Sequence, residues 1–393
     1  METTSDGWVD PAAEVDWQAV RRAFPATREL IYLDTARKSL LPVFAREGAA
    51  NWFDDIDRTG GASAFAAESV EVARVELAAF IGSRPESLAY VKNTADGLNA
   101  VAQSVALLPG DNVVLTTLEH ENNVLPWRHL QHRGVELRYV TPDEDGNLPP
   151  ERFAAHVDRR TRVVAMSWVT YGTGQRLDIG NIAKIAHAVD ALVVVDAIQG
   201  LGLLDQPVAA LGADIVVSGG HKMLLSPVGA GIMYISPEAL PQLTPPFAGK
   251  NAVKPAERFM GPLAFHDDAR RFEYGNPNLL AIAVQRRAIS FLASLGRAAI
   301  ERRILTLGGL LIERLTKSSF ELLTPRSAGA RAGIISIRGE PGMERIVAKL
   351  REEGCVVSLK DGFLRASLFI YNDEADIERF ADRLITLWQG IQQ

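Results

Sequence analysis

The fold is decided by residues 192–196, LVVVD, and by residues 215–222, IVVSGGHK. Each segment begins with a run of β-branched and other apolar residues, which is typical of a strand buried on both faces of a parallel sheet. Asp196 ends the first run, and Lys222 follows the second run after a Gly-Gly turn. In an open α/β sheet the carboxyl ends of such strands face one crevice, where ligands bind. We therefore expect Asp196 and Lys222 to lie close together in a binding site.

An acid and a lysine in one crevice suit pyridoxal 5′-phosphate (PLP). The lysine forms a Schiff base with the cofactor aldehyde, and the acid keeps the pyridine nitrogen protonated so that the ring accepts electrons. The same residues also fit a buried acid at a strand end and a surface lysine in a loop, so other signals in the chain must decide between the two interpretations.

The composition limits which classes of binding partner and which cellular compartment we expect. The chain has 393 residues, 47% hydrophobic content, a net charge of -6 and one cysteine. The negative charge and the lack of basic runs predict neither a nucleic-acid partner nor a membrane surface. No apolar run approaches the roughly 20 residues that span a bilayer, and the polar first residues do not resemble a secretory signal. A single cysteine excludes an internal disulfide framework, so we expect a cytoplasmic protein. The histidines show no metal-ligand spacing, and we expect no metal.

Strand and helix patterns alternate from about residue 87 onward, which predicts a mostly parallel sheet covered on both faces. A proline-rich segment, residues 240–262, breaks the pattern and predicts a long functional loop or a domain crossing. After it we expect a smaller α+β unit with strands at residues 332–337, 355–359 and 364–367. The predicted organisation is a flexible tail (1–15), an N-terminal segment that joins the small domain (16–60), a large cofactor-binding domain (61–275), and a linking helix with the small C-terminal domain (276–393).

Three further polar side chains follow predicted strands. Thr94 opens a helix after residues 88–91, so its hydroxyl and the neighbouring amides could cradle a phosphate, or Thr94 could only be an N-cap. His120 could stack on a pyridine ring or could be a solvated loop residue. Gln199, three residues beyond Asp196, could donate to the phenolic oxygen of the ring or could cap a turn.

Five stretches, taken in order, resemble the class V aminotransferase and cysteine desulfurase superfamily, and the segment near the C-terminus is most similar to its isopenicillin-N-epimerase-like branch. These stretches are residues 117–127, 195–199, 220–222, 272–278 and 364–372. The likeness extends from about residue 31 to residue 387. It implies an α/β protein of the PLP-dependent transferase fold type I, with a large domain built on a mostly parallel seven-stranded sheet and a smaller α+β domain.

The resemblance also implies roles for matching positions around the cofactor. Lys222 would be the catalytic residue that carries the Schiff base, His120 would stack on the ring, Asp196 would pair with the pyridinium, and Gln199 would contact the phenolic oxygen. The phosphate would be held by Thr94, the amide of Ala95 and His221.

Two more positions concern the substrate and a second subunit. Asn276 stands where the family usually has a threonine that reaches the phosphate of the neighbouring subunit, which implies a homodimer with shared active sites. Arg365 matches the arginine that holds the substrate α-carboxylate, a task suited to its bidentate fork.

The resemblance predicts a PLP enzyme that acts at Cα of an amino acid, with carbon–sulfur lyase (β-elimination) or aminotransferase chemistry of the kind found in secondary metabolism. Epimerisation is an alternative, although it needs a second acid–base group that the sequence does not identify. Cys355 lies ten positions before Arg365, too close for the loop that carries the catalytic cysteine of desulfurases, so we expect a small core residue there and no desulfurase. A catalytically silent PLP scaffold is the alternative from another class, and the sequence does not predict the substrate.

Overall fold

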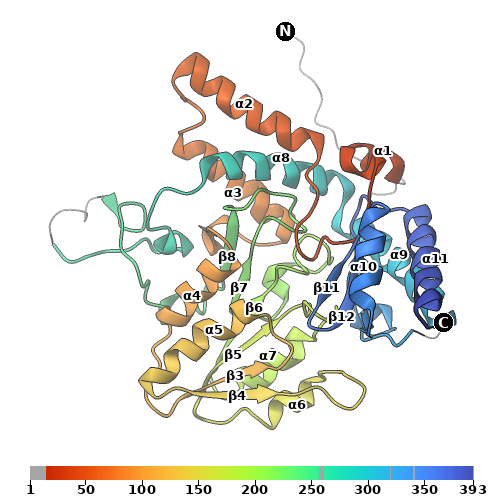
Figure 1. Cartoon of the computed structure of the whole chain (residues 1–393). Coiled ribbons are helices and arrows are strands. Elements are labelled where there is room, and N and C mark those ends of the chain that lie inside the picture. Colours follow the sequence, from red (N-terminus) through yellow and green to blue (C-terminus); the bar gives the residue numbers. More distant parts are fainter. Residues whose placement is uncertain (1–14, 256–260, 319, 340, 393) are drawn as a thin grey trace.

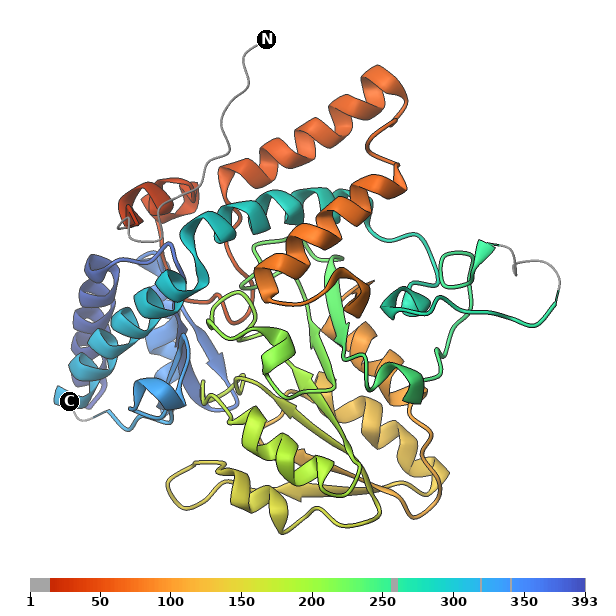
Figure 2. The ribbon, with the colours of Figure 1, turned by 180° about the vertical axis from the view of Figure 1, so that it is seen from behind.

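The computed structural model describes residues 15–255, 261–318, 320–339 and 341–392, and Figures 1 and 2 show it from opposite sides. The predicted tail, residues 1–15, lies almost entirely outside these ranges. A central sheet with helices on both faces makes up the larger part, and a smaller unit of strands and helices lies beside it (Figure 1). The predicted fold class is confirmed, whereas the exact domain boundaries stay a prediction.

The central sheet contains seven strands in the order β2-β8-β7-β6-β5-β3-β4. The pairs from β7 through β6, β5 and β3 to β4 are parallel, whereas β8 runs antiparallel to both β2 and β7. The sheet is therefore mostly parallel, as predicted. Its strands are β2 (Leu88–Val91), β3 (Asn112–Thr116), β4 (Glu136–Val140), β5 (Thr161–Ser167), β6 (Leu192–Asp196), β7 (Ile215–Ser218) and β8 (Gly231–Ile235).

The apolar runs in these strands follow from burial on both faces. Val193 and Val195 on β6 belong to the core that includes α7, while Val194 belongs to the core on the other face with α4 and α5. Full burial of one such side chain stabilises the fold by about 1.5–3 kcal/mol. The helices that belong to this unit are α3 (Ala67–Ile81), α4 (Thr94–Ser104), α5 (Glu121–His129), α6 (Pro150–Ala154) and α7 (Ile179–His187).

Strand register brings the polar residues at the carboxyl ends of neighbouring strands together. Ser167 at the end of β5 lies opposite Asp196, and Asp196 lies opposite Val217 on β7. The chain then turns through two glycines to Lys222. A Cβ atom at Gly220 would lie 2.3 Å from the carbonyl oxygen of Ala230, so only glycine allows this close passage.

The smaller unit is a three-stranded antiparallel sheet, order β11-β12-β9, packed against helices. Its strands are β9 (Ile334–Arg338), β11 (Ser358–Lys360) and β12 (Phe363–Ser367), and its helices are α9 (Arg297–Lys317), α10 (Met343–Glu352) and α11 (Glu374–Gln392). The strand predicted at residues 355–359 is wrong in detail, because this stretch forms two short strands. Its first part, β10 (Cys355–Val356), pairs in parallel with β1 (Ile31–Tyr32), and only β11 joins the three-stranded sheet.

The N-terminal segment therefore contacts the smaller unit. Besides the β1–β10 pair, Arg21 on α1 (Trp17–Arg22) lies 2.6 Å from the carboxylate of Asp376 at the start of α11. Farther along the chain comes α2 (Val43–Thr59). The helix α8 (Leu279–Leu295) packs against both α2 and α3 (Figure 2).

A side-chain cap sets the start of several helices. Asn93, Asp178 and Asn278 each accept a hydrogen bond from a backbone N–H in the first turn of α4, α7 and α8. Gly296, with φ of 77°, ends α8 and turns the chain into α9 at a bend of 79°. Among the described helices, none is by itself long and apolar enough to cross a membrane, and α8 and α9 meet that criterion only as a bent pair.

Candidate active site

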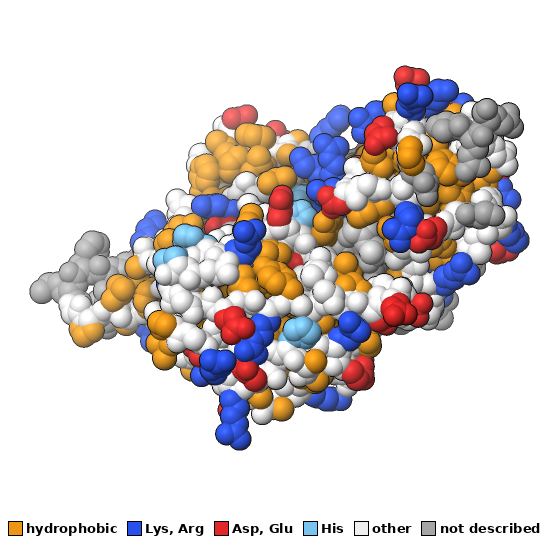
Figure 3. Space-filling view, turned by 60° about the horizontal axis from the view of Figure 1, so that its bottom comes forward, with side chains coloured by type: hydrophobic (Ala, Val, Ile, Leu, Met, Phe, Trp, Pro, Cys, Tyr) orange, Lys and Arg blue, Asp and Glu red, His pale blue; other side chains and the backbone are white. Residues whose placement is uncertain are grey.

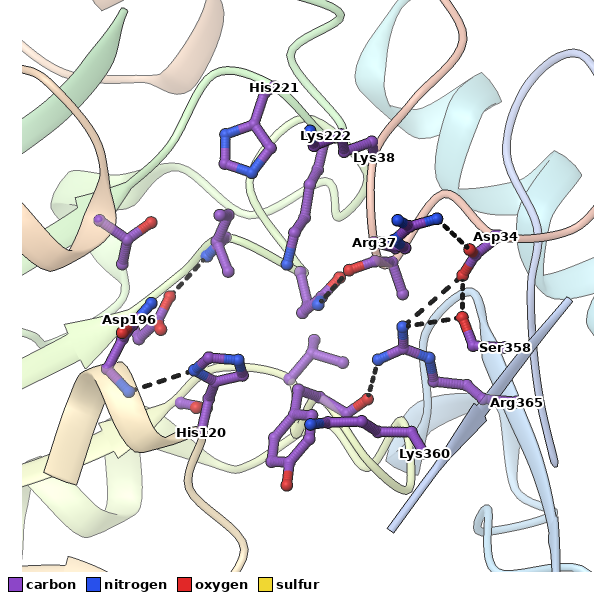
Figure 4. Close-up of a pocket in the computed structure, with 18 of the residues that line it drawn as sticks. Asp34, Arg37, Lys38, His120, Asp196, His221, Lys222, Ser358, Lys360 and Arg365 are labelled. Atoms are coloured by element: carbon purple, nitrogen blue, oxygen red, sulfur yellow. Dashed lines mark hydrogen bonds and ion pairs between the residues drawn. The ribbon is translucent and has the colours of Figure 1, made fainter. Parts of the chain in front are cut away.

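A cavity of about 850 Å³ lies at the carboxyl ends of the central strands, where the smaller unit faces the sheet (Figure 4). Eight of the nine predicted site residues line it, namely Thr94, Ala95, His120, Asp196, Gln199, His221, Lys222 and Arg365. Asn276 does not line the cavity and is exposed. Its predicted contact is with a second subunit, so that role stays a prediction.

Lys222 extends into the middle of the cavity, with Asp196 and His120 on one side and Asp34 and Arg365 on the other (Figure 4). Asp196 is 5% exposed, and its Oδ1 accepts a hydrogen bond of 3.0 Å from the amide of Ile198. Burial raises the pKa of Asp196, and burial lowers the pKa of Lys222 below its ordinary value. Both shifts prepare the pair for proton chemistry near neutral pH.

The phosphate cradle predicted at the start of α4 has the geometry of an anion site. Asn93 is the N-cap of this helix, since its Oδ1 accepts from the amide of Asp96 at 2.9 Å, so Thr94 is not the N-cap. Thr94 is 4% exposed, and its hydroxyl oxygen has no hydrogen-bond partner within the described part of the chain. A buried polar atom without a partner costs about 1–3 kcal/mol. The hydroxyl and the first-turn amides, including that of Ala95, are therefore suited to bind an anion.

The remaining polar groups around Lys222 also fit PLP. Gln199 is 2% exposed and donates one amide hydrogen to the carbonyl of Ala36 at 3.0 Å, while its Oε1 has no partner among the described residues. Burial and the positive charges of Lys222 and Lys38 lower the pKa of His221 to about 4, so His221 is neutral at pH 7. The unpartnered Thr94 and Gln199 oxygens, the helix terminus and the lysine–aspartate pair together match a phosphorylated pyridine aldehyde.

His120 is held in place by its own loop. Its Nδ1 accepts a hydrogen bond of 3.1 Å from the amide of Asn122, and its ring meets that of Tyr171 edge-to-face with centroids 5.0 Å apart. Burial, followed by the charge of Lys222, lowers the pKa of His120. The neutral imidazole then carries its proton on Nε2, because Nδ1 is the acceptor. Next to it, the buried carboxylate of Glu119 accepts hydrogen bonds from Ser167, among others, and ties this loop to β5.

Arg365 lies on β12 and is 5% exposed. Its Nη1 donates to the carbonyl of Tyr171 at 2.9 Å, and its Nη2 lies 3.7 Å from Asp34 and 3.4 Å from the hydroxyl of Ser358. Ser358 also donates to Asp34, which is 1% exposed (Figure 4). Asp34 was not predicted as a site residue, although it ends a short apolar stretch much as Asp196 does. Nothing in the sequence indicated Tyr171 or Ser358.

Cys355 lies outside the cavity lining. It is 4% exposed in the hydrophobic core of the smaller unit, opposite Ile31, and burial raises the pKa of its thiol. The prediction of a small core residue is therefore confirmed. Within the described residues, no group of three His, Cys, Asp or Glu side chains is arranged to hold a metal ion.

Comparison with known proteins places this site in a family. A family model described as aminotransferase class-V matches residues 57–380. The chain is 31% identical to a cysteine desulfurase of Enterobacter sp. (strain 638) over 402 residues, which covers 94% of this chain and 96% of that protein. The apo structure of a cysteine desulfurase from Thermococcus onnurineus NA1 superposes with a TM-score of 0.87 at 27% identity, covering 96% of this chain and 99% of that one.

A second solved structure is the complex of a cystine C–S lyase with its product cysteine persulfide. It has a TM-score of 0.84 at 23% identity and covers 92% of this chain and 99% of that chain, a likeness that concerns the fold alone. The relatives named cysteine desulfurases give no support to the expectation that such an activity is improbable here. That expectation depends on the position of Cys355 alone.

Proposed function

Because this chain belongs to the class-V aminotransferase family, PLP-dependent enzymes of fold type I that act on amino acids, we propose that it cleaves a carbon–sulfur bond by β-elimination. One observation carries the proposal. The cavity brings together a lysine, an acid and an arginine for Cα chemistry, while the only thiol of the chain lies buried outside it. A leaving sulfur therefore departs into the cavity and not onto an enzyme cysteine.

Each residue has a distinct task in this proposal. When bound, PLP supplies an electron sink for the charge that develops at Cα. Thr94, the Ala95 amide and His221 would hold its phosphate, and Asp196, Gln199 and His120 would hold its ring. Arg365 orients the amino acid by its α-carboxylate.

Lys222 removes the Cα proton with its neutral amine. Its lowered pKa increases the neutral fraction near pH 7, and a positioned base of this kind contributes about 100- to 10,000-fold to the rate. The Cα–H and Cβ–S bonds break, a Cα=Cβ bond forms, and the sulfur leaves with its electron pair and takes up a proton. Uptake of one water then gives pyruvate, ammonia and a thiol, so atoms and electrons balance.

The experiment is product analysis with S-substituted cysteines and with ordinary amino acids. We expect pyruvate and thiol in equal amounts, absent in Lys222→Ala and preserved in the matched surface variant Lys184→Ala on α7. A keto acid that retains the sulfur would identify an aminotransferase, an inverted amino acid would identify an epimerase, and no Cα exchange at all would identify a silent scaffold. Each of these three results would refute β-elimination.

We also propose a homodimer in which Asn276 reaches the phosphate site of the neighbouring subunit. The exposed position of Asn276, outside the cavity of its own chain, supports this proposal. Sedimentation equilibrium should give twice the chain mass, and Asn276→Ala should weaken PLP binding without dissociating the dimer. A monomer with full PLP affinity would contradict it.

A further inference from the structure

The cavity carries far more positive charge than the rest of the protein. Among the described residues, six cationic side chains and two carboxylates line it, whereas the whole chain has a net charge of -6. On the face shown in Figure 3, Lys and Arg side chains are mixed with Asp and Glu side chains over most of the surface. The excess of positive charge in the cavity is therefore local, and a cleft lined by one sign of charge concentrates ligands of the opposite sign.

Two of the six cations already have an anion assigned to them, and a third lies close to a residue of the phosphate site. Lys222 lines the cavity together with Asp196, and Arg365 is the residue proposed to hold the substrate α-carboxylate. Lys38 lies on the phosphate side of the cavity, since its charge helps to lower the pKa of His221. The other three are Arg37, Arg351 and Lys360, here called the cationic wall.

Lys360 is the least exposed member of the cationic wall. Its ammonium lies 5.9 Å from the centre of the Tyr171 ring, and Figure 4 shows it pointing into the cavity. Its charge contributes to the lowered pKa of His120, after burial and the charge of Lys222. The nearest carboxylate is that of Asp361, at 3.9 Å, which also accepts a hydrogen bond of 2.6 Å from the Tyr171 hydroxyl. Lys360 is therefore only weakly neutralised.

The two arginines of the cationic wall are no better paired. Arg37 is 68% exposed at its side chain and lies 4.0 Å from Asp34, which Arg365 and Ser358 already engage. Within the described residues, no carboxylate forms an ion pair with Arg351. Burial raises the pKa of Asp34, and the charge of Arg351 is one of the smaller influences that oppose this rise. The apolar side chains of Val347, Val357 and Leu359 line the same part of the cavity.

We propose that the cationic wall binds an anionic group on the sulfur substituent of the substrate. The substrate class is then an S-conjugate of cysteine whose leaving thiol carries a carboxylate or a sulfonate, joined through an alkyl linker that contacts the apolar residues. This inference rests on the proposed β-elimination. Single exposed ion pairs contribute little, but three cations that line one cleft together attract an anion that enters it.

The test compares two substrates of nearly the same shape that differ in charge at the end of the sulfur substituent. They are S-(2-carboxyethyl)-L-cysteine and S-(2-carbamoylethyl)-L-cysteine. We expect kcat/KM to be about tenfold higher for the acid than for the amide, mainly through KM, because the wall attracts only the acid. In Lys360→Met this ratio should fall about threefold, the effect expected of one partly exposed cation, while the matched variant Lys184→Met should keep it. Calorimetric titration of Lys222→Ala, which cannot turn substrate over, should give the same preference as a ratio of Kd values.

The outcomes separate the inference from the proposed function. Equal kcat/KM for both compounds, or a ratio that Lys360→Met leaves intact, would overturn the inference while β-elimination stands. Failure of both compounds to give pyruvate would refute β-elimination, and equal calorimetric affinities in that case would overturn the inference as well. A tenfold binding preference without turnover would support the cationic wall alone.

Discussion

Replacing Arg365 by methionine removes a buried guanidinium that faces Lys222 across the cavity. Its Nη1 is fixed by the Tyr171 carbonyl at 2.9 Å, and its Nη2 lies near Asp34 at 3.7 Å. This support comes from two different segments of the chain and holds the fork in one orientation. The methionine side chain has a similar length but neither the charge nor the donors, so the substrate α-carboxylate loses its partner.

The size of the effect follows from the burial of the site. Removing one partner of a buried, hydrogen-bonded charge pair costs about 2–5 kcal/mol, which corresponds to a fall of about 30- to 5,000-fold in kcat/KM. Arg365→Lys keeps the charge but loses the planar fork, so it should fall between methionine and the natural residue. PLP binding should be retained, because Tyr171, Ser358 and Asp34, which contact Arg365, are not among the residues assigned to the cofactor.

The assay is steady-state formation of pyruvate from an S-substituted cysteine, with the visible absorbance of the bound cofactor measured in parallel. Arg338→Met is the matched control, since Arg338 lies on β9 of the same small sheet, is 54% exposed at its side chain and pairs with Glu321 outside the cavity. An unchanged kcat/KM in Arg365→Met, or an equal loss in both variants, would refute the assignment of Arg365.

Two further predictions concern Lys222 and Cys355. Burial holds the pKa of Lys222 in the folded chain below its ordinary 10.5. At a pH between the pKa of the folded chain and that of the unfolded chain, the unfolded chain binds a proton that the folded chain does not. The apoprotein should therefore gain stability relative to Lys222→Met as the pH rises toward 10. The Tm of the natural apoprotein minus the Tm of the variant should then increase with pH, and a constant value would mean that the lysine is solvated. Cys355→Ser should retain full turnover with a slightly lower Tm, whereas loss of turnover together with a persulfide on Cys355 in the natural protein would establish a desulfurase.

Much of the sheet and half of the site could be predicted, because a strand that is buried on both faces appears in the sequence as an uninterrupted apolar run. The run from Leu192 to Val195 is uninterrupted because its side chains alternate between two hydrophobic cores. A polar residue that follows such a run, directly as Asp196 does or after a short turn as Lys222 does, lies at the carboxyl ends of the strands, which is why both could be found from sequence.

The support around Arg365 could not be predicted, because it depends on contacts between distant segments. Asp34 meets Ser358 across 324 positions, and the pairing of β1 with β10 and a parallel bridge between Asp34 and Ser367 bring them together. The cationic wall was missed for the same reason, since residues 355–359 were expected to form a single strand and Lys360 had no assigned position. The domain boundaries and the cytoplasmic location stay predictions.

The covalent attachment of PLP to Lys222 is the claim on which the rest depends. Borohydride reduction of the PLP-loaded protein, followed by peptide mass spectrometry, identifies the lysine that carries the cofactor. We expect the added mass on the peptide that contains Lys222 and on no other. Label on Lys38 or Lys360, the other two lysines of the cavity, or no label at all, would contradict the account.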